Sequence, residues 1–473
     1  MVGMMEDMGW LHRPKVALTP TRGRLIGIAL LVAAYVGLVL LRTHDITRTF
    51  WLFSDQILYW DTAQLAFTQQ PLVGPEQHVG GYALGPTYSW FVWLSRVTLG
   101  PFVDNLPHAG AVFQVLVHSA FDGMLLYALW RKTRSIWQAA AAMLLVTTAP
   151  YDLALSATLW NPSLASAAIK GAMAAVLLGW PERSLVGVGV VAGLAWVSMH
   201  FHVPAVFCVM SVFVALVITP VIKRDYRLVG LRASVIAMVV GVMQLPYLVH
   251  RMSAVPGTEA GGVAVTGSLG ATLSGQAPLR IVESVLGLGH AIDRILVDPW
   301  EAAWVGWVVA VCAVAVVVRR RNDMSLQALT VLPLLFSVVG YAFWVGSFDE
   351  YYYLSQMTPV VLTVLFGATA LAGRRANYVG VAALILALAL LPGRVSQART
   401  IHRMPGYDLL VDGSREVLRR GVTVRAITAD FLPTGADPEY LFGLLGGDID
   451  PEGAWVARIQ SDGLVSWESV ASR

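Results

Sequence analysis

The chain has 473 residues, of which 56% are hydrophobic and only 13% are charged, and its mean hydropathy is +0.63. Because soluble domains carry about 25% charged residues, this composition excludes a soluble globular enzyme, a disordered protein and a nucleic-acid-binding protein. The net charge of +3 is small, so the positions of the charges along the chain are more informative than their sum.

Eleven apolar stretches are long enough to predict transmembrane helices. They lie near residues 25–41, 107–130, 135–150, 163–180, 185–200, 203–220, 229–248, 301–318, 326–345, 354–372 and 377–392. No small-residue cleavage site follows the first stretch, so we expect a retained helix rather than a signal peptide. Cys208 and Cys312 both lie inside apolar stretches and predict neither a metal site nor a disulfide.

A twelfth stretch, 83–100, is amphipathic and aromatic, and suits an interfacial or re-entrant helix as well as a span. Cytoplasmic loops of membrane proteins carry an excess of Lys and Arg. With the N-terminus inside and 83–100 not crossing, sixteen basic residues fall in short cytoplasmic segments and six in the much longer outer loops. Since a crossing at 83–100 would invert this bias, we predict eleven spans with the N-terminus inside and the C-terminus outside.

This topology divides the chain into a transmembrane domain, 1–392, and a small extracytoplasmic domain, 393–473. The outer face then carries a first loop (42–106), a segment at 151–162, a turn at His200–His202, a long loop (249–300), a turn at Gly346–Tyr353 and the tail. The long loop has a flexible part, Gly257–Gly275, and an amphipathic helix over 279–296 that suits the membrane surface. In the tail, a helix over 408–420, strands over 422–429 and 455–459 and a turn at 461–464 predict a small α/β appendage.

The first outer loop holds the strongest catalytic candidate. The segment 53–61 begins about a dozen residues beyond the first helix and places Asp55 at the start of a short juxtamembrane helix. A carboxylate at the outer membrane boundary, in partly dry surroundings, suits a general base. The alternative is that Asp55 only caps the N-terminus of that helix.

Three further motifs accompany Asp55 on the outer face. They are Gly85-Pro86-Thr87-Tyr88 in the first loop, Trp160-Asn161-Pro162-Ser163-Leu164 after the third span, and Asp349-Glu350-Tyr351-Tyr352-Tyr353 before the tenth. An acidic residue after the first helix, followed by these motifs in this order, resembles the bacterial GT-C membrane glycosyltransferases. This class includes protein mannosyltransferase-like and aminoarabinose-transferase-like enzymes, and the resemblance covers residues 24–392.

The resemblance implies an all-α polytopic fold in which juxtamembrane helices lie over a bundle of about eleven transmembrane helices. It implies transfer of a sugar from a polyprenyl-phosphate donor to a glycan, lipid or protein acceptor. The reaction takes place at the outer face of the bacterial cytoplasmic membrane, in cell-envelope glycan biosynthesis. The family's first-loop acid maps to Asp55, which would deprotonate or orient the acceptor hydroxyl.

The family often has Asp-Glu at this place, whereas this chain has Asp55-Gln56. The sequence therefore predicts no certain cofactor, and a divalent metal stays open. Asp61 is either a substitute for the missing second acid or a solvated loop carboxylate.

A polyprenyl phosphate keeps its tail in the bilayer and its phosphate at the interface, so the site must offer cations to the leaving phosphate. The candidates are Lys170, in the helix after Asn161, and Arg251, just past the helix that ends near His250. A lysine inside a span is costly and predicts a function; the alternatives are snorkelling and an internal ion pair. Arg280 and Arg294 suit lipid headgroups equally well.

Ten outer-face residues are predicted to contact substrate. They are Asp61, His78, Tyr88, Trp160, Asn161, His200, His202, Asp349, Glu350 and Tyr352. His200 and His202 also suit a metal, but they would need further ligands. Inside a span, His118 and Asp122 stand four residues apart on one helix face and predict a mutual pair, with a proton relay as the alternative.

Two other functions stay open. A polysaccharide polymerase or ligase would use paired arginines and a histidine in outer loops, which Arg251, Arg280 and Arg294 allow. A transporter or lipid-linked-sugar flippase would have discontinuous helices, charges near the bilayer midplane and often a repeat. The sequence shows no repeat, and its polar residues collect on one face.

Overall fold

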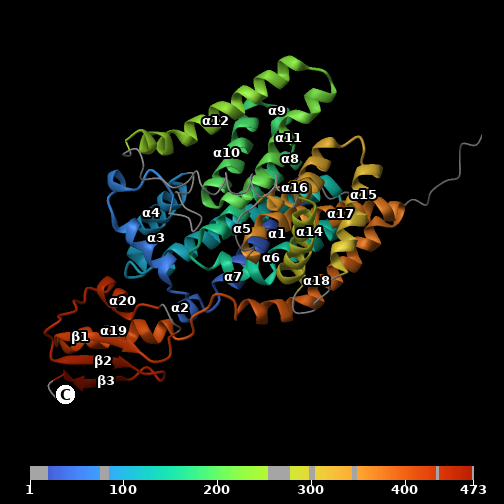
Figure 1. The fold of residues 1–473 in the computed structure, drawn as a ribbon. Coiled ribbons are helices and arrows are strands. Elements are labelled where there is room, and N and C mark those ends of the chain that lie inside the picture. The colour runs from blue at the N-terminus through green and yellow to red at the C-terminus, as the bar shows by residue number, and fades with distance from the viewer. Residues whose placement is uncertain are drawn as a thin grey trace, which may run out of the picture.

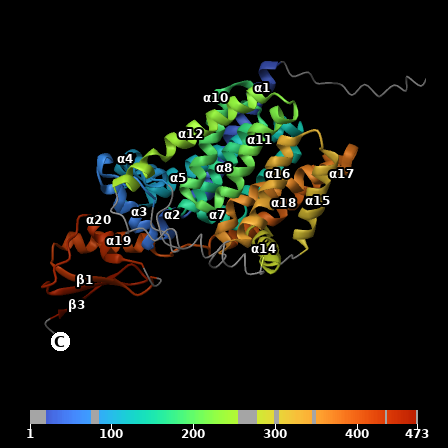
Figure 2. The same ribbon diagram turned by 45° about the horizontal axis from the view of Figure 1, so that its top comes forward.

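The computed structural model describes residues 20–74, 85–253, 277–297, 304–343, 349–432 and 436–470. A bundle of helices forms most of the molecule, and a small α/β unit lies at one end of it (Figure 1). The turned view places the same unit beside helices α2 and α3 of the first outer loop (Figure 2).

Each of the eleven apolar stretches forms a helix. These are α1 (Pro20–Thr43), α5 (His108–Thr133), α6 (Ile136–Thr147), α8 (Asn161–Leu177), α10 (Leu185–Phe201), α11 (Val206–Ile222), α12 (Tyr226–Ser253), α15 (Val305–Arg319), α16 (Met324–Ala342), α17 (Met357–Ala372) and α18 (Ala376–Ala398). Among the described residues, six helical segments are long and apolar enough to cross a membrane, and one of them, Glu350–Ala398, contains both α17 and α18. The chain is therefore a multi-pass membrane protein, while the number of eleven spans stays a prediction.

A seventh span would combine α6 with α7 (Pro150–Ser156), which meet at an angle of 65°. The break has a local cause. Ala149 precedes Pro150 and is extended, with φ −55° and ψ 133°, because a proline disfavours the helical conformation in the residue before it.

The first outer loop contains the expected juxtamembrane helices. They are α2 (Ile46–Thr49), α3 (Ser54–Gln64), η1 (Phe67–Gln69), α4 (Thr87–Leu99) and η2 (Gly100–Phe102). At 13 residues, α4 is about 20 Å long and falls short of the roughly 30 Å hydrocarbon core. It packs on α3, with the rings of Tyr59 and Tyr88 4.6 Å apart. That this helix does not cross the membrane stays a prediction.

The tail is the predicted α/β unit. It consists of α19 (Tyr407–Arg420), β1 (Val424–Ala429), α20 (Pro438–Leu444), β2 (Trp455–Ile459) and β3 (Val465–Ser469). β1 pairs with β2 in parallel, and β2 pairs with β3 antiparallel around the predicted turn. The sequence did not predict α20 or β3. The predicted domain boundary at 392 falls inside α18, which continues to Ala398.

The tail packs directly on the first outer loop. The Met404 N–H donates to the Thr49 carbonyl (3.2 Å) and the Gly406 N–H to that of Arg48 (3.1 Å). The buried rings of Phe50 and Tyr407 lie 5.2 Å apart, in one core that continues into the bundle.

In the long outer loop, α14 (Ala277–Ile292) and η5 (Asp293–Val297) match the expected helix over 279–296. Its apolar side chains Leu279, Val282 and Leu286 are exposed, as a helix on a membrane surface requires. The expected flexible part, 257–275, lies outside the described residues.

A cluster of five charged or ionisable side chains is buried inside the bundle and joins α1, α5, α7 and α8. Arg42 lies 2.6 Å from the Asp122 carboxylate and 2.7 Å from that of Asp152. The Lys170 ammonium lies 2.7 Å from Asp152 and 3.0 Å from Asp122. His118 completes this ion cluster, with Nδ1 3.4 Å from Asp122. Two cations thus balance two carboxylates, which is the condition for burying charge at a tolerable cost.

The ion cluster corrects two predictions and confirms a third. Arg42, which the sequence places in an outer loop, is buried inside the bundle. Lys170, predicted as a phosphate ligand, is fully buried and forms the internal ion pair that was its alternative. His118 and Asp122 pair with each other as expected.

The ion cluster predicts a strong dependence of stability on Lys170. Lys170→Met leaves two buried carboxylates with one cation, and breaking such a pair costs about 3–5 kcal/mol. We expect a lower unfolding temperature and a lower yield of protein in detergent. The double variant Lys170→Met/Asp152→Asn, which restores the charge balance, should be more stable than the single variant.

The matched control is Lys132→Met, which breaks the half-exposed pair with Asp323 (2.7 Å). Such surface pairs contribute about 0–1 kcal/mol. If Lys170→Met and Lys132→Met unfold at the same temperature, the ion cluster does not stabilise the bundle.

Candidate active site

Asp55 lies in the first turn of α3, and its side chain is exposed. Phe53, and not Asp55, is the N-cap of this helix, so the capping alternative is wrong. The Asp55 carboxylate instead accepts a hydrogen bond from the indole N–H of Trp160, from Nε1 to Oδ2, at 3.1 Å. The helix N-terminus adds a favourable field for the carboxylate.

Aromatic rings from four separate segments gather around this hydrogen bond. The Trp160 ring lies 6.2 Å from Trp51, 4.7 Å from Tyr351 and 5.3 Å from His402. Trp51 and His402 are themselves 4.4 Å apart. The sequence positions of these residues show that the first loop, the segment before α8, η6 (Glu350–Gln356) and the chain after α18 all meet here.

His202 and Tyr352 extend the group. The His202 ring lies 5.7 Å from Tyr351 and 5.6 Å from Tyr352, and the two tyrosine rings are 4.6 Å apart. We call the whole group the Asp55 cluster: Asp55, Trp51, Trp160, His202, Tyr351, Tyr352 and His402. Its rings are buried or half-buried, so they exclude water from one side of an exposed carboxylate.

Local structure explains why Trp160 points at Asp55. Trp160 is the N-cap of α8 and is extended (φ −148°, ψ 136°), as N-cap residues typically are. Asn161 donates from Nδ2 to the Phe201 carbonyl at 2.5 Å, which fixes this segment to the end of α10. Asn161, predicted as a substrate contact, therefore serves to position Trp160.

The two histidines of the Asp55 cluster are neutral at ordinary pH. Burial lowers the pKa of His202 to about 3 and also lowers the pKa of His402. His402 has φ +46°, a conformation that costs non-glycine residues about 1–2 kcal/mol. Neutral imidazoles suit hydrogen bonds to hydroxyl groups better than charge pairing with a phosphate.

Other predicted residues lie away from Asp55. His200 is held between Thr87, with Oγ1 2.8 Å from Nδ1, and Gln244, with Nε2 3.2 Å from His200 Nε2. Because both of its ring nitrogens already have these protein partners, His200 is poorly placed to bind a metal together with His202. Tyr88 is buried, and its hydroxyl donates to Gln114 at 3.4 Å; these burial and bonding data contradict a direct substrate contact.

The three other acids predicted to contact substrate lie in different parts of the structure. Asp349 lies beside Tyr351 at the rim of the Asp55 cluster, whereas Glu350 lies 3.9 Å from Arg294 and so holds η5. Asp61 is exposed and lies beside Tyr440 of the tail. Burial is the main cause that raises the pKa of Tyr440, and the neighbouring Asp61 carboxylate raises it further.

Arg251, the second predicted phosphate ligand, is exposed in the last turn of α12, with its guanidinium 6.0 Å from the centre of the Tyr247 ring. Its role as a phosphate ligand stays a proposal. His78 lies outside the described residues.

The sequence missed three members of the Asp55 cluster. Tyr351 is adjacent to the predicted Tyr352, and the aromatic run itself was the available signal. Trp51 and His402 are brought together only by the pairing of segments far apart in the chain, for which no local pattern exists.

No protein-family model and no curated protein matches the sequence. Among solved structures, the chain is similar to ArnT from Cupriavidus metallidurans in the apo state, with 12% identity, coverage of 89% of this chain and 85% of that chain, and a TM-score of 0.46. It is also similar to the same protein bound to undecaprenyl phosphate (14% identity, 89% and 85% coverage, TM-score 0.42). A third structure is the arabinofuranosyltransferase AftD from Mycobacteria (16% identity, 88% of this chain and 31% of that chain, TM-score 0.38). Both proteins are GT-C glycosyltransferases.

The lowered pKa of His202 predicts that acid destabilises the protein. Below its usual pKa of about 6.5, His202 takes up a proton in the unfolded chain but not in the folded one, so stability falls as the pH falls. We expect detergent-purified protein to unfold at a lower temperature at pH 5 than at pH 7.5, and His202→Asn to reduce this difference. His290→Asn, at an exposed histidine of α14, is the control. A pH difference that is the same in His202→Asn and wild type would contradict the prediction.

Proposed function

We propose that the chain is a membrane glycosyltransferase of the GT-C type, in which Asp55 is the general base. It would transfer a sugar from a polyprenyl-phosphate donor to a hydroxyl group of a glycan, lipid or protein acceptor. The observation that carries this proposal is the exposed Asp55 carboxylate, held by one indole N–H among rings from four segments. Aromatic walls with a few placed polar groups are typical of small-molecule sites, and the similarity of the chain to a protein solved with undecaprenyl phosphate is consistent with such a donor.

The two oxygens of the Asp55 carboxylate would have different roles. Oδ2 accepts the Trp160 N–H, which leaves Oδ1 to accept the proton of the acceptor hydroxyl. As that proton moves to Asp55, the hydroxyl oxygen bonds to the anomeric carbon of the sugar. The bond from this carbon to the phosphate oxygen breaks, and the lipid phosphate leaves with the electron pair. The neutral His202 and His402 can hold sugar hydroxyls in the orientation that this step needs.

The residues beside Asp55 do not fit a divalent metal. The next residue, Gln56, is fully buried, and its amide has no hydrogen-bond partner within the described part of the chain. An amide cannot replace the charge of a second carboxylate. His118, Asp122 and Asp152 lie within ligand distance of one another, but Arg42 and Lys170 already neutralise these carboxylates. We therefore derive no step through a metal.

Two features bear on the transporter alternative. The bend between α6 and α7 and the buried ion cluster are features that a transporter predicts. However, the charges of the ion cluster balance one another and are closed to solvent, so none is left for a substrate. The proposal of a transferase therefore accounts better for the exposed carboxylate.

Asp55→Asn tests the general base directly. The amide keeps the size of the side chain but cannot accept the proton, and general-base catalysis typically contributes about 10²–10⁴-fold to the rate. We expect a loss of that order in sugar transfer by purified protein in proteoliposomes, with an unchanged detergent-extracted yield. The control is Asp61→Asn, an exposed acid on the same helix. Wild-type rates in well-folded Asp55→Asn protein would overturn the assignment.

The proposed site must face the extracytoplasmic side, which cysteine labelling tests. In a background with Cys208→Ser and Cys312→Ser, single cysteines are introduced by Asp462→Cys in the tail and Arg375→Cys in the short connection before α18. We expect an impermeant maleimide to label the first in intact cells and the second only after permeabilisation. The reverse pattern would overturn the orientation and, with it, the shared outer face.

A further inference from the structure

A groove of roughly 440 Å³ runs along the outside of α15 and is bordered by the end of α17. Figures 1 and 2 place these two helices side by side at the edge of the bundle, on the side away from the α/β unit. The apolar lining of the groove includes Trp307, Ala310, Val311, Val314, Val318 and Leu371. Arg319, the last residue of α15, lines one end of it. The groove therefore combines an apolar length with a cationic end.

The packing of α15 on α17 explains why this surface is hollow. An added Cβ at Gly367 would lie 2.4 Å from the carbonyl oxygen of Cys312, so only glycine allows the two helices to approach so closely. Beside this contact, α15 presents the small side chains of Ala310 and Ala315 to the groove, and Leu371 borders it from α17. Small side chains between larger ones leave a groove that the protein itself does not fill.

The groove has the length of a lipid acyl chain in one leaflet. From Trp307 to Arg319 the helix rises about 18 Å, and one leaflet contributes about half of the roughly 30 Å hydrocarbon core. Val311 and Val314 are 58% and 63% exposed, so the groove is open along its side. An acyl chain can therefore enter it sideways from the bilayer.

Five arginines lie around the cationic end of the groove. They are Arg319, Arg320 and Arg321 at the end of α15, and Arg374 and Arg375 in η7 (Gly373–Arg375), directly beyond α17. All five are exposed, and none has an ion pair with another residue that the structure describes. The acid nearest to them in the sequence, Asp323, is already paired with Lys132 at 2.7 Å. This end of the groove thus carries positive charge that the described part of the protein does not balance.

The groove is separate from the Asp55 cluster. α17 begins directly after η6, which carries Tyr351 and Tyr352 of that cluster, and its 16 residues span about 24 Å. The five arginines lie at the other end of this helix. In the predicted topology they face the cytoplasmic leaflet, whose surface is negatively charged.

We propose that this groove binds one anionic phospholipid. One acyl chain lies along Val318, Val314 and Val311 toward Trp307, and the headgroup phosphate accepts hydrogen bonds from Arg319 and from the arginines of η7. Arginine binds phosphate bidentately, and basic pockets between transmembrane helices are typical headgroup sites. A zwitterionic lipid carries its own cation beside the phosphate, so the unbalanced arginines favour an anionic headgroup. This inference does not depend on the proposed transferase function.

A second groove of the same size offers an internal comparison. It has a volume of roughly 420 Å³, lies between α10, α11 and α12, and is lined only by uncharged side chains among the described residues. Ala233 lines it, and the adjacent Arg232 is buried and bound to Glu182 at 2.9 Å. Basic residues at cytoplasmic helix ends are general in membrane proteins, whereas an unpaired arginine at the end of a groove distinguishes the first groove from the second.

The test places a fluorescent probe in each groove. In a full chain with Cys208→Ser and Cys312→Ser, a single cysteine introduced by Val314→Cys or Ala233→Cys is labelled with bimane, and the protein is placed in phosphatidylcholine nanodiscs. Phosphatidylglycerol or phosphatidylcholine with a spin label on the acyl chain then quenches the probe on contact. One arginine near a membrane surface strengthens binding of anionic lipid about fivefold. We therefore expect phosphatidylglycerol to quench the Val314→Cys probe at a mole fraction at least about fivefold lower than phosphatidylcholine does, and both lipids to quench the Ala233→Cys probe equally.

Two pairs of variants separate the headgroup from the acyl chain. Arg319→Gln/Arg374→Gln should remove the preference for phosphatidylglycerol at the Val314→Cys probe, whereas Lys223→Gln/Arg227→Gln, at exposed positions between α11 and α12, removes the same charge and should keep the preference. Ala310→Phe fills the groove at an exposed position and should weaken quenching by phosphatidylglycerol. Its control is Ala382→Phe, at an exposed alanine of α18.

Three results would overturn the site. An equal preference for phosphatidylglycerol at both probes would show that the charge of the whole surface attracts the lipid. A preference that survives Arg319→Gln/Arg374→Gln would exclude the arginines as the headgroup site. Unchanged quenching in Ala310→Phe would exclude the groove as the site of the acyl chain.

Discussion

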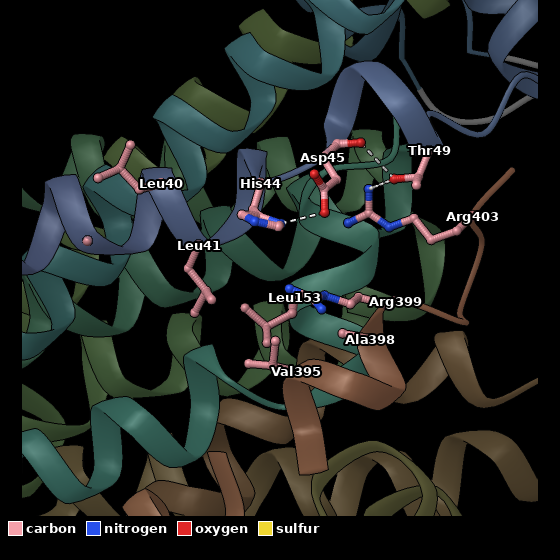
Figure 3. A pocket seen from close by; sticks show the side chains of 11 residues that line it. Leu40, Leu41, His44, Asp45, Thr49, Leu153, Val395, Ala398, Arg399 and Arg403 are labelled. Atoms are coloured by element: carbon pink, nitrogen blue, oxygen red, sulfur yellow. Dashed lines mark hydrogen bonds and ion pairs between the residues drawn. The ribbon is translucent and has the colours of Figure 1, made fainter. Parts of the chain in front are cut away.

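The balanced ion cluster inside the bundle is the constraint on which the packing around the Asp55 cluster depends. Arg42 and Lys170 bind the same two carboxylates, Asp122 and Asp152, so none of the four can move without exposing a buried charge. A nonpolar packing of the same helices could be equally stable, but it would not fix which faces of α1 and α7 meet. Because Arg42 binds Asp152, the adjacent Leu41 and Leu153 lie together in a small apolar cluster that includes Ala398 of α18 (Figure 3).

The same constraint acts on the Asp55 cluster through α8. Lys170 anchors this helix to α7 and α5, and the start of α8 carries Trp160, which binds Asp55. Asn161, the first residue of α8, also donates a hydrogen bond to the Phe201 carbonyl at the end of α10. This bond is a second contact that holds the start of α8 in place. The indole N–H therefore has a defined position, although the connection that carries it is short and irregular. Positioning of this kind is what a catalytic carboxylate requires from its surroundings.

The features that the sequence predicts correctly are those with a local signal. The eleven helices follow from the length of their apolar stretches, and the pair of His118 and Asp122 follows from a spacing of four on a helix. Arg42 was misplaced because its burial depends on carboxylates in α5 and α7, which no pattern around residue 42 reveals. Lys170 was recognised as unusual, but only the fold shows that its partners are internal. Trp51 and His402 meet through the pairing of 48–49 with 404–406, which sequence spacing alone cannot predict.

The pairing of 48–49 with 404–406 also shows that the tail contributes to the Asp55 cluster. The sequence presents 393–473 as an appendage, yet His402 near its start contacts Trp51 and belongs to the Asp55 cluster. The rest of the tail holds this start in place: Tyr407 packs on Phe50, and Arg415 pairs with Asp104 of the first loop. The tail is therefore part of the structure that holds the rings of Trp51 and His402 against Trp160, and not a separate appendage.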